Sequence, residues 1–119
     1  MSESEKMVPI LFTPGAIVLT DGIVEFLGNG RDPDDGPDEE RTMFLAQCFT
    51  SHVTGDWGDL DAEDRATMRR NLRTGATLMS SFVYHPEEEA FRIWIISDSV
   101  PAEYSQTRAV TTALRPEEY

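Results

Sequence analysis

Cysteine, basic residues and long apolar runs are all scarce in this sequence. The single cysteine, Cys48, excludes an internal disulfide and a zinc site built from several thiolates. The first residues have neither the basic region nor the apolar region of a signal peptide, and no apolar run reaches the length of a membrane span. We therefore expect a cytoplasmic protein that does not bind membranes.

Lys and Arg number only 10 against 22 Asp and Glu, which gives a formal net charge of −12. A field this negative repels phosphate, so direct binding to nucleic acid is disfavoured and a protein partner with a basic surface is favoured. The chain also lacks a Walker loop, a GxGxxG fingerprint and a GxSxG nucleophile elbow. We predict no catalytic residue and no cofactor, and the residues favour a protein that is not an enzyme.

The chain does contain enough apolar residues for one core, since 39% of its 119 residues are hydrophobic. We expect a single domain over residues 1–119. Apolar spacings and caps predict a short helix from Asp21 to Leu27 and two longer helices, at 39–53 and between Asp61 and Gly75. Apolar and β-branched runs predict a buried strand at 16–19 and further strands at 76–84, 90–97 and 108–114. This order predicts an α+β fold with an antiparallel sheet of three to four strands and two to three helices packed mainly on one face.

An acidic segment at residues 28–40 interrupts the apolar pattern. Its core, RDPDDGPD, contains two prolines, a glycine and four aspartates, a composition that predicts a flexible loop. A calcium loop would need Gly at position six and Glu at position twelve, where this chain has Pro37 and Met43. We therefore consider a solvated loop or a negative arm that meets a basic partner through Asp32, Asp34, Asp35, Asp38, Glu39 and Glu40.

The turn HVTGDWGDLD at residues 52–61 concentrates chemically interesting side chains between two predicted helices. His52 beside Asp56 and Trp57 could form a ligand site in which histidine acts as acid or base. The competing interpretation is structural: glycines make tight turns, Trp57 fills the base of the core, and aspartates cap the following helix. The spacing favours the structural interpretation, because no second histidine stands nearby and no HExxH pattern is present. We predict no metal site.

Several strings carry a resemblance to a known family. They are Thr13-Pro14-Gly15-Ala16, GDWGDLDAEDR at 55–65, Ile93-Trp94-Ile95-Ile96 and TTALRPEEY at 111–119. They resemble a family of small bacterial proteins found on plasmids, phages and other mobile elements, which shares a GDWGDLD-x-ED motif and a TT-x-L-x-PEEY C-terminus. The resemblance implies a mobile-element setting but no settled activity. Residues 28–40 depart from the pattern and look like an insertion peculiar to this chain.

The charge and the resemblance together predict a non-enzymatic acidic interaction protein from a mobile genetic element. It would inhibit a nucleic-acid-binding host defence complex by presenting carboxylates where phosphates would sit, as a DNA mimic does. The predicted partner-binding residues are the six acids at 32–40 together with Asp59, Asp61, Glu63 and Asp64.

Two alternatives stay open. One is a small enzyme, or a ligand- or metal-binding protein, that uses His52, Asp56 and Trp57. The other is a structural or regulatory homo-oligomer, such as a homodimer, in which Phe82 and Trp94 extend past the core into an interface.

Overall fold

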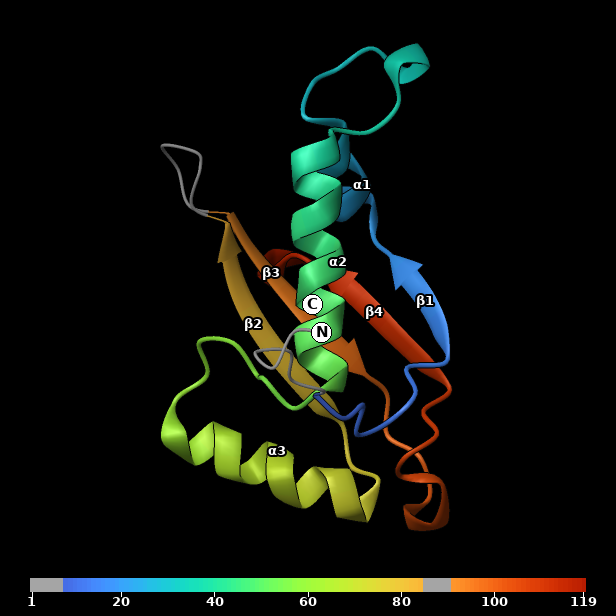
Figure 1. Cartoon of the computed structure of the whole chain (residues 1–119), viewed down its shortest axis with the longest axis vertical. Helices are drawn as coiled ribbons and strands as arrows, with labels where there is room; N and C mark the ends of the chain where they lie inside the picture. Colours follow the sequence, from blue (N-terminus) through green and yellow to red (C-terminus); the bar gives the residue numbers. More distant parts are fainter. Residues whose placement is uncertain (1–7, 85–90) are drawn as a thin grey trace, which may run out of the picture.

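The computed structural model describes residues 8–84 and 91–119, which form a four-stranded sheet with helices packed against it (Figure 1). The strands are β1 (Ala16–Leu19), β2 (Leu78–Tyr84), β3 (Phe91–Ser97) and β4 (Val110–Leu114), in the order β1-β4-β3-β2. β3 pairs antiparallel with both β2 and β4, whereas β1 pairs parallel to β4. The predicted α+β fold is confirmed, with a sheet that is mixed rather than wholly antiparallel.

Three α-helices accompany the sheet, and local caps set their bounds. They are α1 (Asp21–Gly28), α2 (Glu39–Val53) and α3 (Ala62–Thr74). The Asp38 carboxylate accepts from the amide of Arg41 in the first turn of α2, and Asp61 accepts from the amide of Asp64 at 2.8 Å in the first turn of α3. Gly75 ends α3 with a left-handed φ of 83°, a conformation that glycine adopts without strain. The predicted bounds of α2 and α3 are therefore confirmed.

The main core lies between one face of the sheet and the helices α1 and α2. Figure 1 shows α2 running across that face, with α1 behind its upper end. The buried members of this core are Ile23, Phe26, Leu45, Cys48, Tyr84, Ile93, Ile95 and Ala113. A smaller cluster contains Phe12, Trp57 and Leu78, and α3 contributes only partly buried side chains to it. Helix α3 therefore covers the core only thinly.

Strand β1 is the element whose burial the sequence analysis predicted wrongly. All of its residues are exposed, and Ile17 and Val18 are 49% and 43% accessible. The error has a physical cause, because a continuous apolar run is typical both of a buried strand and of a strand at an open sheet edge. β3, by contrast, occupies an inner position of the sheet.

Among the described residues, the structure contains no helix with the length and apolarity that a membrane crossing requires. The segment that joins the predicted strands 76–84 and 90–97 lies outside the described residues.

Candidate functional site

The acidic arm, defined as residues 31–40, extends beyond the sheet at the top of Figure 1. It contains one turn of 3-10 helix, and Asp32 starts that turn by accepting from an amide two residues later at 3.0 Å. Near the end of the arm, the Asp38 carboxylate accepts from the Arg41 amide at 3.0 Å and from the Asn29 side chain at 3.1 Å. These hydrogen bonds hold the pKa of Asp38 below its usual value. The segment predicted as a flexible loop thus contains two aspartates that cap its own backbone amides or those of α2, and its flexibility stays a prediction.

The six acids of the arm divide into two groups according to what their side chains contact. Asp32 and Asp38 hold backbone amides, and Glu40 accepts from the Tyr84 hydroxyl at 3.3 Å. The other three are exposed, and their side chains make no hydrogen bond or ion pair with the described residues. We call these the free carboxylates of the arm: Asp34, Asp35 and Glu39.

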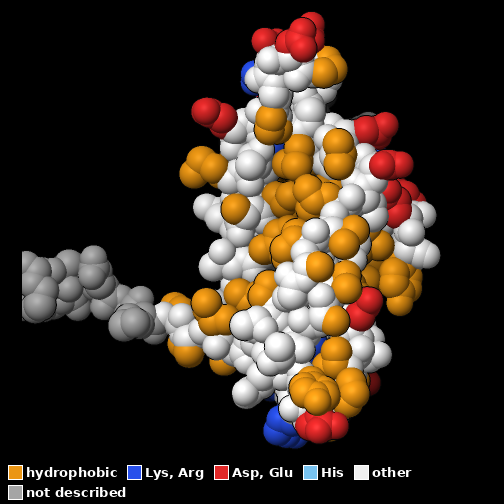
Figure 2. All heavy atoms as spheres, turned by 90° about the vertical axis from the view of Figure 1, so that its right-hand side faces the viewer, with side chains coloured by type: hydrophobic (Ala, Val, Ile, Leu, Met, Phe, Trp, Pro, Cys, Tyr) orange, Lys and Arg blue, Asp and Glu red, His pale blue; other side chains and the backbone are white. Residues whose placement is uncertain are grey.

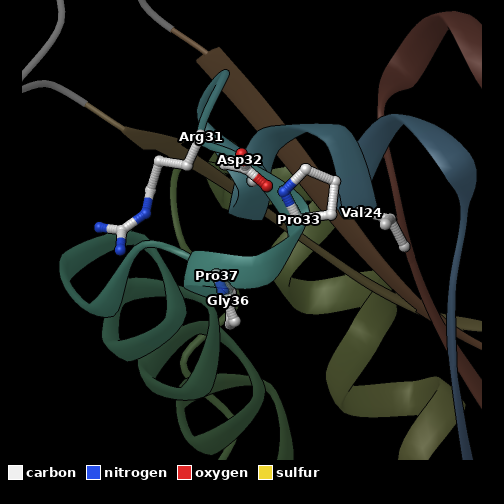
Figure 3. A pocket seen from close by; sticks show the side chains of 7 residues that line it. Val24, Arg31, Asp32, Pro33, Gly36 and Pro37 are labelled. Carbon is white, nitrogen blue, oxygen red and sulfur yellow. The ribbon is translucent and has the colours of Figure 1, made fainter.

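A shallow hollow of about 420 Å³ lies beside the arm (Figure 3). Its lining includes Val24 from α1 and Pro33 from the arm, and in Figure 3 Arg31 points away from both. The complete lining is Val24, Gly28, Arg31, Asp32, Pro33, Gly36 and Pro37. Much of this lining is apolar, and its charged members are one carboxylate, Asp32, and one cation, Arg31.

The second predicted acidic patch lies at the start of α3, at the opposite end of the molecule (Figure 1). Asp59 forms an ion pair with Arg92 at 2.5 Å, and Asp61 is occupied as the cap of α3. Partial burial raises the pKa of Asp59, but hydrogen bonds from Arg92 and Ser81 outweigh it and hold that pKa below its usual value.

Within this second patch, Glu63 and Asp64 are exposed and their side chains have no partner among the described residues. A hollow of about 410 Å³ beside them is lined by Asp59, Leu60, Asp61, Asp64, Met79, Ser81, Arg92 and Trp94. The structure therefore does not bring the two predicted patches together, and each would meet a partner separately.

His52 lies in the core, with no exposed surface. Its Nδ1 is 2.7 Å from the Ser80 hydroxyl and its Nε2 is 2.9 Å from the Ser97 hydroxyl. The Ser97 hydroxyl is in turn 2.6 Å from that of Thr111, which donates to the carbonyl of Pro14. Burial, and secondarily the positive charge of Arg108, lowers the pKa of His52 to about 3. This neutral imidazole, with both ring nitrogens hydrogen-bonded, connects α2 to β2 and β3 directly and to β4 through the hydroxyl chain. Because it is buried, it has no access to a substrate.

Asp56 and Trp57 likewise have structural surroundings. The Asp56 carboxylate accepts from the Gly58 amide at 3.1 Å, and Trp57 is 2% exposed in the smaller core cluster. The backbone of Trp57 and Asp59 is hydrogen-bonded to Ser81 on the outer edge of β2. The geometry thus favours the structural interpretation of the GDWG turn, and nothing in it supports the alternative site of an acid–base histidine.

Two structural residues escaped the sequence analysis. Arg108 is 1% exposed and donates to backbone carbonyls of five residues: Asn71, Gly75, Ala76, Asp98 and Ser105. Glu118 accepts from the Thr20 hydroxyl at 2.7 Å and from the Gly22 amide at 3.0 Å, so the C-terminal PEEY string caps the start of α1. Neither role has a local sequence signal, because the partners are distant in the chain.

Neither a metal site nor a known relative adds to the functional argument. In the described ranges 8–84 and 91–119, no group of three or more His, Cys, Asp and Glu side chains could hold a metal ion. No family model, curated protein or solved structure matches the chain. The resemblance to proteins of mobile elements therefore stays a prediction, and the functional argument depends on the arm and its surroundings.

Proposed function

We propose that the protein is a non-enzymatic interaction module of the cytoplasm that binds a basic protein surface through its acidic arm. The partner surface is of the kind that holds nucleic-acid phosphates, so binding would inhibit a nucleic-acid-binding complex. The observation that carries the proposal is the placement of the free carboxylates Asp34 and Asp35 on a projecting turn beside a largely apolar hollow, with Glu39 following at the start of α2.

The arm is a better binding element than the patch on α3. In the patch, Arg92 neutralises Asp59, and the exposed cations Arg69, Arg70 and Arg73 follow on the same helix. In the arm, Arg31 is the one described cation, and its guanidinium donates to the carbonyl of Asp35 at 3.2 Å. The arm thus offers a more uniform negative field to a basic partner.

The division of the acids matters for the experiment. Replacing all six would remove the caps at Asp32 and Asp38, so a loss of binding could come from a loss of fold. Asp34→Asn with Asp35→Asn removes two free carboxylates and leaves both caps in place. Two matched variants remove the same charge elsewhere: Glu63→Gln with Asp64→Asn on α3, and Asp98→Asn with Glu103→Gln at exposed positions between β3 and β4.

The test passes a bacterial lysate over each immobilised variant at low and at moderate salt and identifies the retained proteins. The expected result is a nucleic-acid-binding protein that the wild type and the two matched variants retain and that added DNA displaces. The D34N/D35N variant should bind it roughly tenfold more weakly or worse, a loss of about 1.4 kcal/mol. Retention should also fall as salt rises.

Two outcomes would contradict the proposal. One is equal retention of the same partner by the D34N/D35N variant and the wild type. The other is equal weakening by all three variants, which would indicate a response to net charge alone rather than to the arm.

A further inference from the structure

The two outer strands of the sheet, β1 and β2, differ in whether another segment is hydrogen-bonded to their outer edge. On β2, the turn at 57–59 pairs with the outer edge: the Ser81 amide donates to the Trp57 carbonyl at 3.2 Å, and the Asp59 amide donates to the Ser81 carbonyl at 2.9 Å. On β1, no described segment pairs with the outer edge. Proteins usually protect such an edge with charges, proline or a covering segment, and the AIVL sequence of β1 contains none of these.

The backbone groups that face the open edge can be identified from the pairing of β1 with β4. The amides of Ala16 and Thr20 donate to carbonyls of residues 109 and 113 at the β4 side. Because the direction of backbone groups alternates along a strand, Ile17 and Leu19 direct their N–H and C=O groups outward. Each of these two residues therefore presents one donor and one acceptor to a further strand.

The surroundings of this edge are apolar. Figure 2 looks at the side of the molecule that carries β1 and α1, and hydrophobic side chains form a band along its middle with charged groups toward the ends and rim. The large exposed apolar residues in these two elements are Ile17, Val18, Leu19 and Val24. No residue of β1 carries a charge, although the chain as a whole has a net charge of −12.

We propose that β1 is a self-association surface, on which a second copy of this chain adds its own β1 in antiparallel orientation about a two-fold axis at Val18. In that register Ile17 of one copy lies opposite Leu19 of the other. Each such pair exchanges two hydrogen bonds, so every outward group identified above acquires a partner. The two Val18 side chains meet at the axis.

A second copy fits this edge better than a strand of a different protein. The two-fold arrangement stops at a dimer, because each copy uses its open β1 edge in the contact. The outer edges that remain belong to β2, where the turn at 57–59 already pairs with the strand. An uncharged strand also offers no group that would attract or orient a charged partner, and it adds no charge of its own to a contact between two copies of charge −12.

The interface differs from the one that the sequence suggested. Trp94 packs against Tyr119 with their rings 5.7 Å apart, and Phe82 packs against the main core. Both side chains thus already have intramolecular contacts. A four-residue strand with its neighbours buries less than the roughly 800 Å² per partner of a standard interface, so we expect a weak dimer whose population depends on concentration.

Salt separates this surface from the arm. Self-association of two acidic copies should strengthen as salt screens their repulsion, whereas binding of the arm to a basic partner should weaken. The two proposals can therefore fail independently.

The test combines sedimentation equilibrium with cysteine cross-linking. We expect the wild-type protein to dimerise with a dissociation constant below about 1 mM, and more tightly at high salt. Val18→Glu should be monomeric because two carboxylates would meet at the axis. Met43→Glu adds the same charge at a 65% exposed apolar position on α2 and should leave the dimer unchanged.

The cross-linking arm tests the register. Val18→Cys should form a disulfide-linked dimer under mild oxidation, because directly opposed residues of this kind lie about 4.5 Å apart at Cα. Ala16→Cys lies on the same face but opposite Thr20 of the other copy, so it should not cross-link. Three results would overturn the proposal: a wild type that stays monomeric at about 1 mM in high salt, a Val18→Glu dimer as stable as the wild type, or equal cross-linking of the two cysteine variants.

Discussion

Substitution of Gly58 by alanine tests whether the GDWG turn is held against the edge of β2. Gly58 has a φ of 72°, and an added Cβ would lie 1.9 Å from the Ser81 carbonyl oxygen, where ordinary contact begins at 3.4 Å. Gly30 has a φ of 71° with nothing within 4 Å of the same added atom. The two glycines thus share the backbone strain and differ in the contact.

The magnitude follows from these two terms. A left-handed alanine costs about 1 to 2 kcal/mol, which is the whole effect expected for Gly30→Ala. Gly58→Ala must also push the turn away from β2 and lengthen the two hydrogen bonds to Ser81, each of which contributes about 0.5 to 1.5 kcal/mol. We therefore expect Gly58→Ala to lower the free energy of unfolding by about 2 to 5 kcal/mol.

Urea unfolding followed by far-ultraviolet circular dichroism measures both variants against the wild type. The decisive quantity is the difference between the two alanine variants, because it removes the shared strain of the backbone. Equal destabilisation by Gly58→Ala and Gly30→Ala would refute the close approach of the turn to Ser81.

Three further predictions concern His52, Glu118 and Cys48. The pKa of His52 is about 3 in the folded chain against 6.5 for the free side chain, so the unfolded state binds more protons between these values. Because of this group, the free energy of unfolding should fall by about 2 kcal/mol as the pH falls from 6.5 to 5. Urea unfolding at several pH values measures this dependence on pH, and the contribution of His52 to it should be absent in His52→Gln. The hydrogen bonds from Thr20, Arg115 and Gly22 hold the pKa of Glu118 below its usual value, so Glu118→Gln should lower the stability at neutral pH. This difference should vanish in urea titrations as the pH falls through that lowered pKa and the wild-type carboxylate is itself protonated. Burial raises the pKa of the Cys48 thiol to about 12, so a disulfide reagent in mildly alkaline buffer should label it slowly in the folded protein and rapidly in urea; rapid labelling of the folded protein would contradict its burial.

The helices were predictable because their signals are local. Asp38 and Asp61 each lie within three residues of the amide that they cap, and Gly75 ends its helix through its own backbone angle. A reader of the sequence can recognise such patterns without knowing the fold. The same holds for β3, whose apolar residues on both faces indicate an inner strand.

The sheet arrangement and the long-range contacts were not predictable in this way. The parallel pairing of β1 with β4 joins residues more than ninety positions apart, as does the capping of α1 by Glu118. Arg108 collects five carbonyl groups from segments that meet only in the folded chain. The sequence likewise shows six acids in the arm but does not distinguish those that cap backbone amides from those that face solvent.

This distinction between acids is the central claim, and one paired measurement on the Asp34→Asn, Asp35→Asn variant tests it most directly. One aliquot of the variant is unfolded in urea to measure its unfolding midpoint. A second, folded aliquot is immobilised to measure its retention of the captured partner, and both values are compared with those of the wild type. The account predicts an unchanged unfolding midpoint and a roughly tenfold loss of binding, because neither side chain contacts the described fold. A shifted midpoint, or full retention of the partner, would contradict it.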